Sequence, residues 1–213
     1  MELINALVEE YASKITSPDD ELLQQIQQQT LANHLHAHML SSPVQGKILT
    51  FLSTILQPKY VLEIGTFTGY SALCLAKGLT ANGELHTIEL RNEDAQTAKK
   101  NFSFSAYHNQ LILHTGNALE IIPALNYKWD LVFIDADKTG YIDYYEMILP
   151  RLSDRGIMIA DNVLFHGQIF EEPIKNKNAK AIVAFNSHVK EDARTEQVLL
   201  TARDGLLLIK KKL

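Results

Sequence analysis

The sequence contains a single cysteine, Cys74, so no disulfide can form within the chain. A lone cysteine fits a protein of a reducing compartment. Cys74 lies in an apolar helical pattern, where a small buried side chain is its expected role. We therefore expect a cytoplasmic protein.

Long apolar runs and an excess of basic residues are also missing. No stretch approaches the roughly 20 apolar residues of a membrane-spanning helix, and the acidic, amphipathic N-terminus does not resemble a signal peptide. The 20 basic residues are outnumbered by 25 acidic ones, for a formal net charge of -5. This balance argues against a nucleic acid bound on a broad basic face. We expect neither a membrane nor a nucleic acid as a partner.

The chain is long enough for one domain with a substantial core, since 46% of its 213 residues are hydrophobic. We expect a single domain over residues 1–213, with a helical cap over residues 1–55 and an α/β core over residues 56–213. In the cap, Ser17 and Pro18 predict a helix start, as N-cap and first-turn residue.

From residue 60 onward, apolar strand patterns alternate with helical patterns. The five strand patterns cover residues 60–64, 83–90, 110–116, 129–135 and 155–161. Such alternation predicts right-handed crossovers and a parallel sheet. Two further apolar runs flank the turn signal at residues 202–205, which predicts a hairpin. The sequence therefore predicts an α/β fold: a Rossmann-like, doubly wound, seven-stranded sheet that is mostly parallel, with a C-terminal antiparallel hairpin and N-terminal helices.

Ligands of open α/β sheets bind beyond the carboxyl ends of the strands, so the residues at these ends are informative. Gly65 and Gly69 follow the first strand and allow close approach of a ligand to the backbone. Phe67 between them departs from the dinucleotide fingerprint. Glu63 suits a cationic ligand, although a helix-capping or buried paired acid explains it equally well. Glu89, at the end of the second strand, suits the two hydroxyls of a ribose.

The fourth and fifth strands end in a second polar group. Asp135 follows the fourth, and Asp161 and Asn162 follow the fifth. Two carboxylates and an amide oxygen form a hard-oxygen site that suits Mg²⁺, with Mn²⁺ or Ca²⁺ as alternatives. Asp161 and Asn162 acting as a simple turn is the competing interpretation. We expect Asp137 to be structural and to pair with a nearby base.

Six segments together resemble the cation-dependent O-methyltransferases of the caffeoyl-CoA and catechol type, family 3 of the small-molecule O-methyltransferases. They are VLEIGTFTGYSAL, TIEL, GNALE, VFIDADKTGYIDYY, IADNVLFHG and the terminal DGLLLIKK. The segment MLSSPVQGKIL is similar to the stretch with which the family covers its cofactor. The resemblance runs from about residue 39 to the C-terminus and implies S-adenosylmethionine as the methyl donor.

The resemblance also implies roles for individual residues. Residues that would bind the cofactor are Ser41, Glu63, Gly65, Thr66, Ser71, Glu89, Ala118 and Asp135. The metal would be held by Asp135, Asp161 and Asn162, and the catalytic group would comprise Lys138, Asp135 and Asn162. The acceptor would contact Phe165, His166 and Lys138; plant members usually have Trp-Asn at the first two positions. A homodimer is also implied.

These inferences converge on methyl transfer to a hydroxyl of a small, catechol-like aromatic acceptor. A phenol has a pKa near ~10 and is mostly neutral at pH 7. A divalent cation would lower that pKa, and Lys138, with a pKa lowered by the metal and by burial, would take the proton. An RNA-directed methyltransferase, a nicotinamide-cofactor oxidoreductase or a non-catalytic binding protein on a similar sheet are the alternatives.

Overall fold

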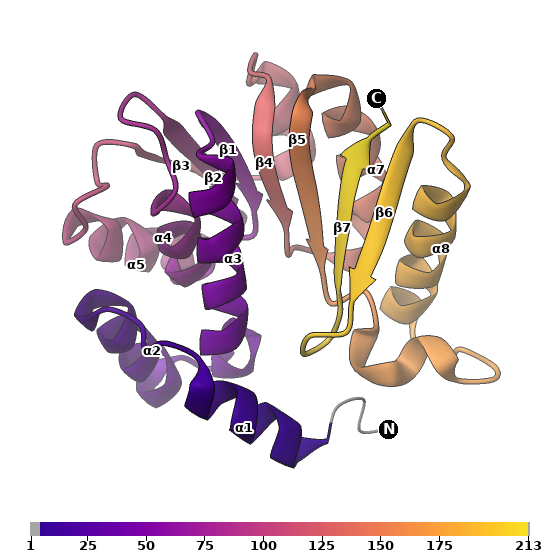
Figure 1. Cartoon of the computed structure of the whole chain (residues 1–213), viewed down its shortest axis with the longest axis horizontal. Helices are drawn as coiled ribbons and strands as arrows, with labels where there is room; N and C mark the ends of the chain where they lie inside the picture. Colours follow the sequence, from indigo (N-terminus) through magenta and orange to yellow (C-terminus); the bar gives the residue numbers. More distant parts are fainter. Residues whose placement is uncertain (1–4, 213) are drawn as a thin grey trace.

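The computed structural model describes residues 5–212, which contain one seven-stranded sheet with helices on both faces (Figure 1). The strands are β1 (Tyr60–Ile64), β2 (Glu84–Glu89), β3 (Leu111–Thr115), β4 (Trp129–Ile134), β5 (Leu152–Asp161), β6 (Thr195–Leu200) and β7 (Leu206–Lys211). The α-helices are α1 (Ala6–Ile15), α2 (Glu21–Asn33), α3 (Pro43–Leu56), α4 (Tyr70–Ala76), α5 (Asn92–Ser103), α6 (Ala118–Ile121), α7 (Tyr141–Ile148) and α8 (Lys177–Glu191). No helix among these residues is long and apolar enough to span a bilayer.

The strand order is β3-β2-β1-β4-β5-β7-β6. Strands β1 to β5 pair in parallel, whereas β7 pairs antiparallel with β5 and with β6. The order reverses between β1 and β4, the point where open α/β sheets bind ligands. The predicted fold is confirmed, and the predicted strand at residues 155–161 begins earlier, at Leu152.

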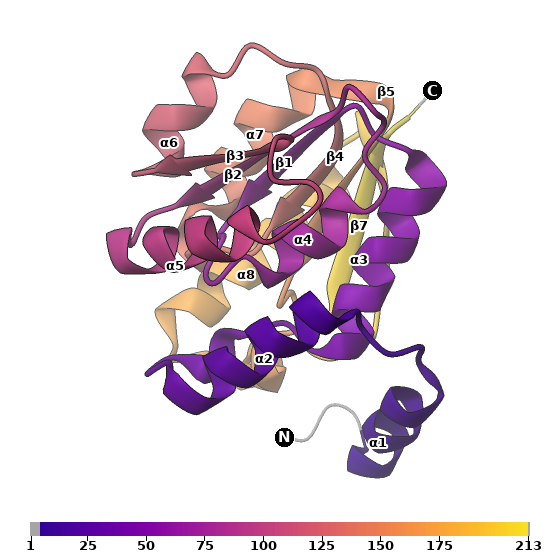
Figure 2. The ribbon, with the colours of Figure 1, turned by 90° about the vertical axis from the view of Figure 1, so that its left-hand side faces the viewer.

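The central strands are buried on both faces, which is why they read as continuous apolar runs. Along β4, Val132 and Ile134 pack with one core layer, which includes α7 and α8. Leu131 and Phe133 face the opposite layer, which includes α3 and α4. Figure 2 shows α3, α4 and α5 on the same side of the sheet. The two layers fix the strands, and therefore their carboxyl ends, in space.

Helices α1 and α2 lie at the end of the molecule toward which the parallel strands point, in both views (Figures 1 and 2). Helix α2 begins at Glu21 with Asp20 as its N-cap, because the Asp20 side chain accepts from the Leu23 N–H at 3.0 Å. The predicted start at Ser17 is therefore wrong by one turn: Asp20 captures the free N–H group and also pairs with Lys77 at 2.7 Å.

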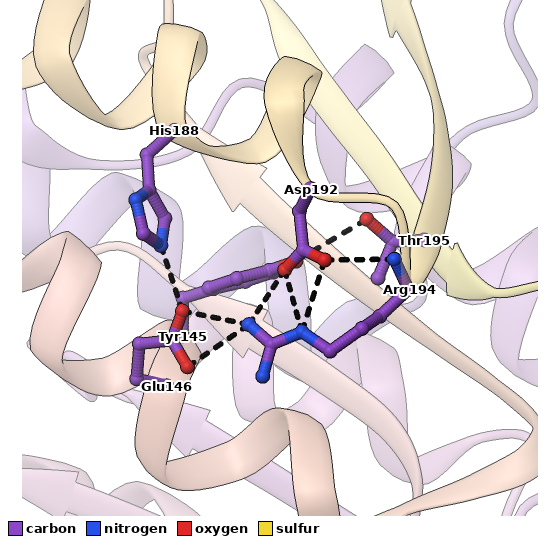
Figure 3. Close-up of polar contacts among 6 residues, drawn as sticks. All are labelled: Tyr145, Glu146, His188, Asp192, Arg194 and Thr195. Atoms are coloured by element: carbon purple, nitrogen blue, oxygen red, sulfur yellow. Dashed lines mark hydrogen bonds and ion pairs between the residues drawn. The ribbon is translucent and has the colours of Figure 1, made fainter.

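A polar cluster joins the C-terminal hairpin to α7 and α8 (Figure 3). The Arg194 guanidinium donates to Asp192 Oδ2 at 2.6 Å and to Glu146 Oε1 at 2.8 Å. His188 Nε2 lies 2.7 Å from the same Glu146 oxygen, and the Tyr145 hydroxyl donates to Asp192 at 2.7 Å. None of these side chains lines the cavity described below.

Candidate active site

A cavity of about 790 Å³ lies at the carboxyl ends of the parallel strands. The predicted cofactor residues that line it are Ser41, Gly65, Thr66, Ser71, Glu89 and Ala118. The predicted metal and acceptor residues that line it are Asp135, Lys138, Asp161, Asn162, Phe165 and His166. The structure thus brings these two groups of residues, predicted from strand ends and from the family resemblance, into one cavity.

Gly65 brings the ends of β1 and β4 together. Its φ of 101° lies in a region that favours glycine. A Cβ at this position would lie 2.0 Å from the backbone oxygen of Asp135. The glycine is therefore required by close packing against Asp135.

Glu89 is held rigidly at the end of β2. Its Oε2 accepts from the Phe67 N–H at 2.7 Å, and its Oε1 accepts from the Arg91 N–H at 2.9 Å. The Glu89 side chain therefore fixes the loop after β1 while also lining the cavity. Its orientation is set before any ligand binds.

Glu63 is the one predicted site residue that does not line the cavity, because it is fully buried beneath the loop after β1. Its Oε2 accepts from the Thr87 hydroxyl, but its Oε1 has no hydrogen-bond partner in the described chain. Burial raises the pKa of Glu63 to about 8, and the charges of Asp135 and Glu89 add to this effect. A buried carboxyl oxygen without a partner is costly unless positive charge lies nearby.

Asp135 and Asp161 stand at neighbouring strand ends, because Ile134 of β4 pairs with Ala160 of β5. Asp161 Oδ1 accepts from the Asn162 N–H at 2.7 Å, and its Oδ2 accepts from the Gln45 side chain. Burial raises the pKa of Asp161 to about 7, with the Asp135 charge as the next cause. Asn162 has a φ of 56°, which asparagine tolerates better than most residues.

Within residues 5–212, no three His, Cys, Asp or Glu side chains are grouped as a metal site. The predicted metal ligands are Asp135, Asp161 and Asn162, and the third of these is an amide, which a group of His, Cys, Asp and Glu side chains does not include. Two carboxylates that repel one another, beside a side-chain carbonyl, still provide the oxygen ligands that a hard divalent cation prefers. The residues at the ends of β4 and β5 therefore fit such an ion.

Lys138 is buried between the acids and an aromatic ring. Its Nζ donates to Asp135 Oδ1 at 3.0 Å and to the Tyr141 hydroxyl at 2.7 Å. Burial lowers the pKa of Lys138, but Tyr141 and the Asp135 carboxylate outweigh it and raise the pKa above that of free lysine. In the protein alone these contacts favour the ammonium form of Lys138, so the lowered pKa expected from the sequence would depend on a bound metal.

The segment after Asn162 is held by the hairpin turn between β6 and β7. Asp204 Oδ1 accepts from the His166 N–H at 2.6 Å, and the Asp204 carbonyl accepts from the Leu164 N–H at 2.9 Å. These bonds hold Phe165 and His166 at positive φ values of 44° and 52°. The His166 side chain is 74% exposed, so it lies at the rim of the cavity.

Among residues 5–212, the side chain of Asp137 contacts hydroxyl groups and no base. Its Oδ1 accepts from the Tyr144 hydroxyl at 2.6 Å, and its Oδ2 accepts from the Thr139 hydroxyl at 3.1 Å. The expected pairing with a base is wrong, because the first turn of α7 places the Tyr144 hydroxyl against this carboxylate.

Sequence reasoning missed Gln45, which contacts Asp161, and Arg203, which contacts Gln45. Gln45 of α3 donates to Asp161, and Arg203 of the hairpin turn donates to Gln45 Oε1 at 3.1 Å. The sequence marks residue 203 only as part of a turn. No local pattern signals a contact between residues that lie 158 positions apart.

Comparisons with known proteins agree with the site. Residues 12–212 match the sequence model of a family described as O-methyltransferase. The chain is 35% identical over 164 residues to a catechol O-methyltransferase of Niastella koreensis, covering 75% of this chain and 74% of the relative. It is 32% identical over 209 residues to a probable caffeoyl-CoA O-methyltransferase of Dictyostelium discoideum, covering 95% of this chain and 88% of the relative.

Solved structures give the same picture. An S-adenosylhomocysteine-bound methyltransferase of Podospora anserina superposes with a TM-score of 0.90 at 29% identity, over 97% of this chain and 94% of that one. An O-methyltransferase of Bacillus cereus, also in complex with S-adenosylhomocysteine, gives a TM-score of 0.88 at 29% identity over 97% of each chain. The chain therefore belongs to the O-methyltransferase family and is an S-adenosylmethionine-dependent O-methyltransferase.

Proposed function

We propose that the enzyme methylates one of two adjacent hydroxyls on a small aromatic acceptor and that a divalent cation, Mg²⁺ foremost, is required. The observation that carries the proposal is the placement of Asp135 and Asp161 side by side, with Lys138, in the cavity that also holds Glu89. The relatives named for catechol and caffeoyl-CoA support an acceptor of this class.

Cofactor binding is assigned to the loop after β1 and to the ends of β2 and β3. Glu89 would accept from the ribose hydroxyls, while Gly65, Thr66 and Ser71 would lie along the methionine part. Ala118 would contact the adenine, and Ser41 would cover the cofactor. Glu63 lies behind this surface, where its unpartnered Oε1 suits the positive charge of a sulfonium ligand.

The cation would be held by Asp135, Asp161 and Asn162. Its chemical contribution is electrostatic, since it lowers the pKa of a nearby phenol and of a nearby ammonium. The burial of Asp161 and its repulsion from Asp135 support this assignment, because added positive charge relieves both. Mn²⁺ and Ca²⁺ suit the same ligands.

Lys138 is assigned as the general base. Once its pKa is lowered by the bound cation, Lys138 would be a neutral amine, and its Nζ would take the proton of the acceptor hydroxyl as the oxygen forms a bond to the methyl carbon. The carbon–sulfur bond breaks with its electron pair left on sulfur, so the sulfonium becomes a neutral thioether. Phe165 and His166 would flank the acceptor ring and align the oxygen for in-line attack.

A methyl-transfer assay tests the proposal. Catechol-type acceptors with adjacent hydroxyls are compared with a matched 1,3-dihydroxybenzene, in chelator and after addition of Mg²⁺, Mn²⁺ or Ca²⁺. We expect turnover of the adjacent diol only, lost in chelator and restored by the metal, with S-adenosylhomocysteine binding largely retained. Full activity in chelator would overturn the metal assignment. Methylation of RNA in preference to any diphenol would favour the RNA-directed alternative.

We also propose a homodimer in the cytoplasm. Helix α1 supports the dimer because it buries none of its side chains and exposes Leu7, Val8, Tyr11 and Ile15 by 59% to 72%. Exposed apolar surface of this kind marks interaction sites. Light scattering should give twice the chain mass of 24.0 kDa, and a monomer at micromolar concentration would contradict the dimer.

A further inference from the structure

Three side chains from separate elements form a chain of hydrogen bonds that ends at Asp161. Arg203, in the turn between β6 and β7, donates through Nη1 to Gln45 Oε1 at 3.1 Å. Gln45, in the first turn of α3, donates through Nε2 to Asp161 Oδ2. Gln45 and Asp161 are each only 2% exposed, so water cannot replace these bonds freely.

The Gln45 side chain makes these distant bonds in place of a hydrogen bond within its own helix turn. Ser42 is the N-cap of α3 and accepts from the Gln45 N–H at 3.3 Å. A glutamine at this position of a helix often returns the bond by reaching back to the N-cap N–H. Among the hydrogen bonds of residues 5–212, the Gln45 side chain instead reaches across the sheet end to Asp161 and Arg203.

Arg203 decides which end of the Gln45 amide faces Asp161. A guanidinium has five N–H donors and no acceptor, so it can bind only the amide oxygen. With Oε1 held by Arg203, the amide NH₂ must point to the carboxylate. If the amide rotated by half a turn, its oxygen would face the Asp161 oxygen, and both would be acceptors without a donor between them.

The backbone around Arg203 is fixed. Arg203 has a φ of 51°, and the Gly205 N–H donates to the Ala202 carbonyl at 3.0 Å to close the turn. The same turn accepts from the N–H groups of Val163 and Leu164, directly after Asn162. In the part of the chain that the structure describes, no acidic side chain forms an ion pair with Arg203, so its best partner there is Gln45.

We propose that Arg203 is a positioning residue for the metal site, acting through Gln45 to hold the Asp161 carboxylate in its ligating orientation. This inference rests on the proposed metal at Asp135, Asp161 and Asn162. Partners that orient metal ligands typically change metal affinity by 10–100-fold when they are removed. Arg203 would therefore matter to metal binding although it is not itself one of the assigned metal ligands.

The experiment measures Mn²⁺ affinity by electron paramagnetic resonance of the free ion, with S-adenosylhomocysteine bound. The proteins are wild type, Arg203→Met, Gln45→Leu and the double variant. Methionine keeps much of the apolar length of arginine without its donors. Arg155→Met makes the same change at an exposed arginine far from the cavity and serves as the control.

We expect Arg203→Met to weaken Mn²⁺ binding by roughly 10-fold or more. In the Gln45→Leu background, the same substitution should have almost no further effect, because its route to Asp161 is gone. The melting temperature and the S-adenosylhomocysteine affinity of Arg203→Met should stay close to those of wild type, as they should for Arg155→Met. This combination separates positioning of the metal ligand from a general loss of structure.

Unchanged Mn²⁺ affinity in Arg203→Met would overturn the inference and leave the proposed function intact. A rise in KM confined to acceptors that carry a carboxylate, with metal affinity unchanged, would show instead that Arg203 binds the acceptor. Equal losses of affinity in the Gln45 and Gln45→Leu backgrounds would also overturn it. If wild type itself fails to bind Mn²⁺, the proposed metal site is wrong and the inference is overturned with it.

Discussion

Lys138 Nζ lies 3.0 Å from Oδ1 of Asp135, so the assigned base and an assigned metal ligand form an ion pair in the protein alone. The Asp135 carboxylate thus has two roles: it pairs with the Lys138 ammonium and it would bind the metal. Any positive charge that binds Asp135 competes with the lysine for that oxygen and disfavours the ammonium. The structure thus offers a physical route by which metal binding and the readiness of the base are coupled.

The first prediction is that Lys138→Ala lowers kcat on a diphenol by about 10²–10⁴-fold, the usual contribution of a general base. Lys138→Arg should not restore activity, because a guanidinium does not release its proton at working pH. Steady-state kinetics at saturating metal and cofactor checks both variants. A near-normal kcat in Lys138→Ala would mean that metal activation alone suffices.

The second prediction concerns Glu89, whose two oxygens accept from the Phe67 and Arg91 N–H groups. Glu89→Ala should weaken S-adenosylhomocysteine binding by roughly 2–3 kcal/mol, because the ribose hydroxyls and these N–H groups lose their acceptor. Glu89→Gln keeps the size and one acceptor, so its loss should be smaller. Calorimetry measures both, and tight NAD binding with no adenosyl ligand bound would refute the assignment.

Much of the fold is encoded locally, which is why it could be predicted. The parallel strands are apolar over their whole length, and the predicted strand at residues 60–64 coincides with β1. Parallel strands also bring their carboxyl ends to one edge, so Glu89, Asp135 and Asp161 could be placed in one site before any contact was known.

The remainder depends on tertiary contacts that leave no local signal. The contact between Gln45 and Asp161 spans 116 positions, and the one between Arg203 and Gln45 spans 158. Glu63 is absent from the cavity lining because it is fully buried and hydrogen-bonded to Thr87 of β2, and the glycine pattern after β1 gives no measure of that burial. The start of α2 was misplaced because two capping residues compete, and only the packed structure selects Asp20.

The third prediction concerns stability. Hydrogen bonds from Arg194 lower the pKa of Asp192 and of Glu146 (Figure 3). A carboxylate with a lowered pKa stabilises the fold above its unfolded pKa of ~4, and this contribution is lost as pH falls through the folded pKa. Arg194→Met should cost about 1 kcal/mol at pH 7, a modest value because the Arg194 and Glu146 side chains are partly exposed to solvent.

Urea denaturation at pH 7 and at pH 2.5 measures this effect. The difference between Arg194→Met and wild type should shrink at pH 2.5, because this pH lies below the unfolded pKa of ~4 and part of the contribution of the two carboxylates is already lost there. Arg155→Met is the matched control and should leave the free energy of unfolding almost unchanged at both values, since Arg155 is exposed. A difference that stays constant with pH would show that Arg194 acts through packing alone.

The last prediction concerns His86 and His114, which stack on β2 and β3 with 3.0 Å between His86 Nδ1 and His114 Nε2. Burial lowers the pKa of both, and for His114 the His86 charge adds to the effect. Protons therefore bind more readily to the unfolded chain, so stability should fall as pH drops below the unfolded value of ~6.5. His114→Gln removes one of the two imidazoles and should reduce this fall between pH 7.5 and pH 5.5, measured by urea denaturation. His108→Gln controls for loss of a histidine elsewhere, and an acid-induced loss equal in wild type and His114→Gln would rule out the pair as its source.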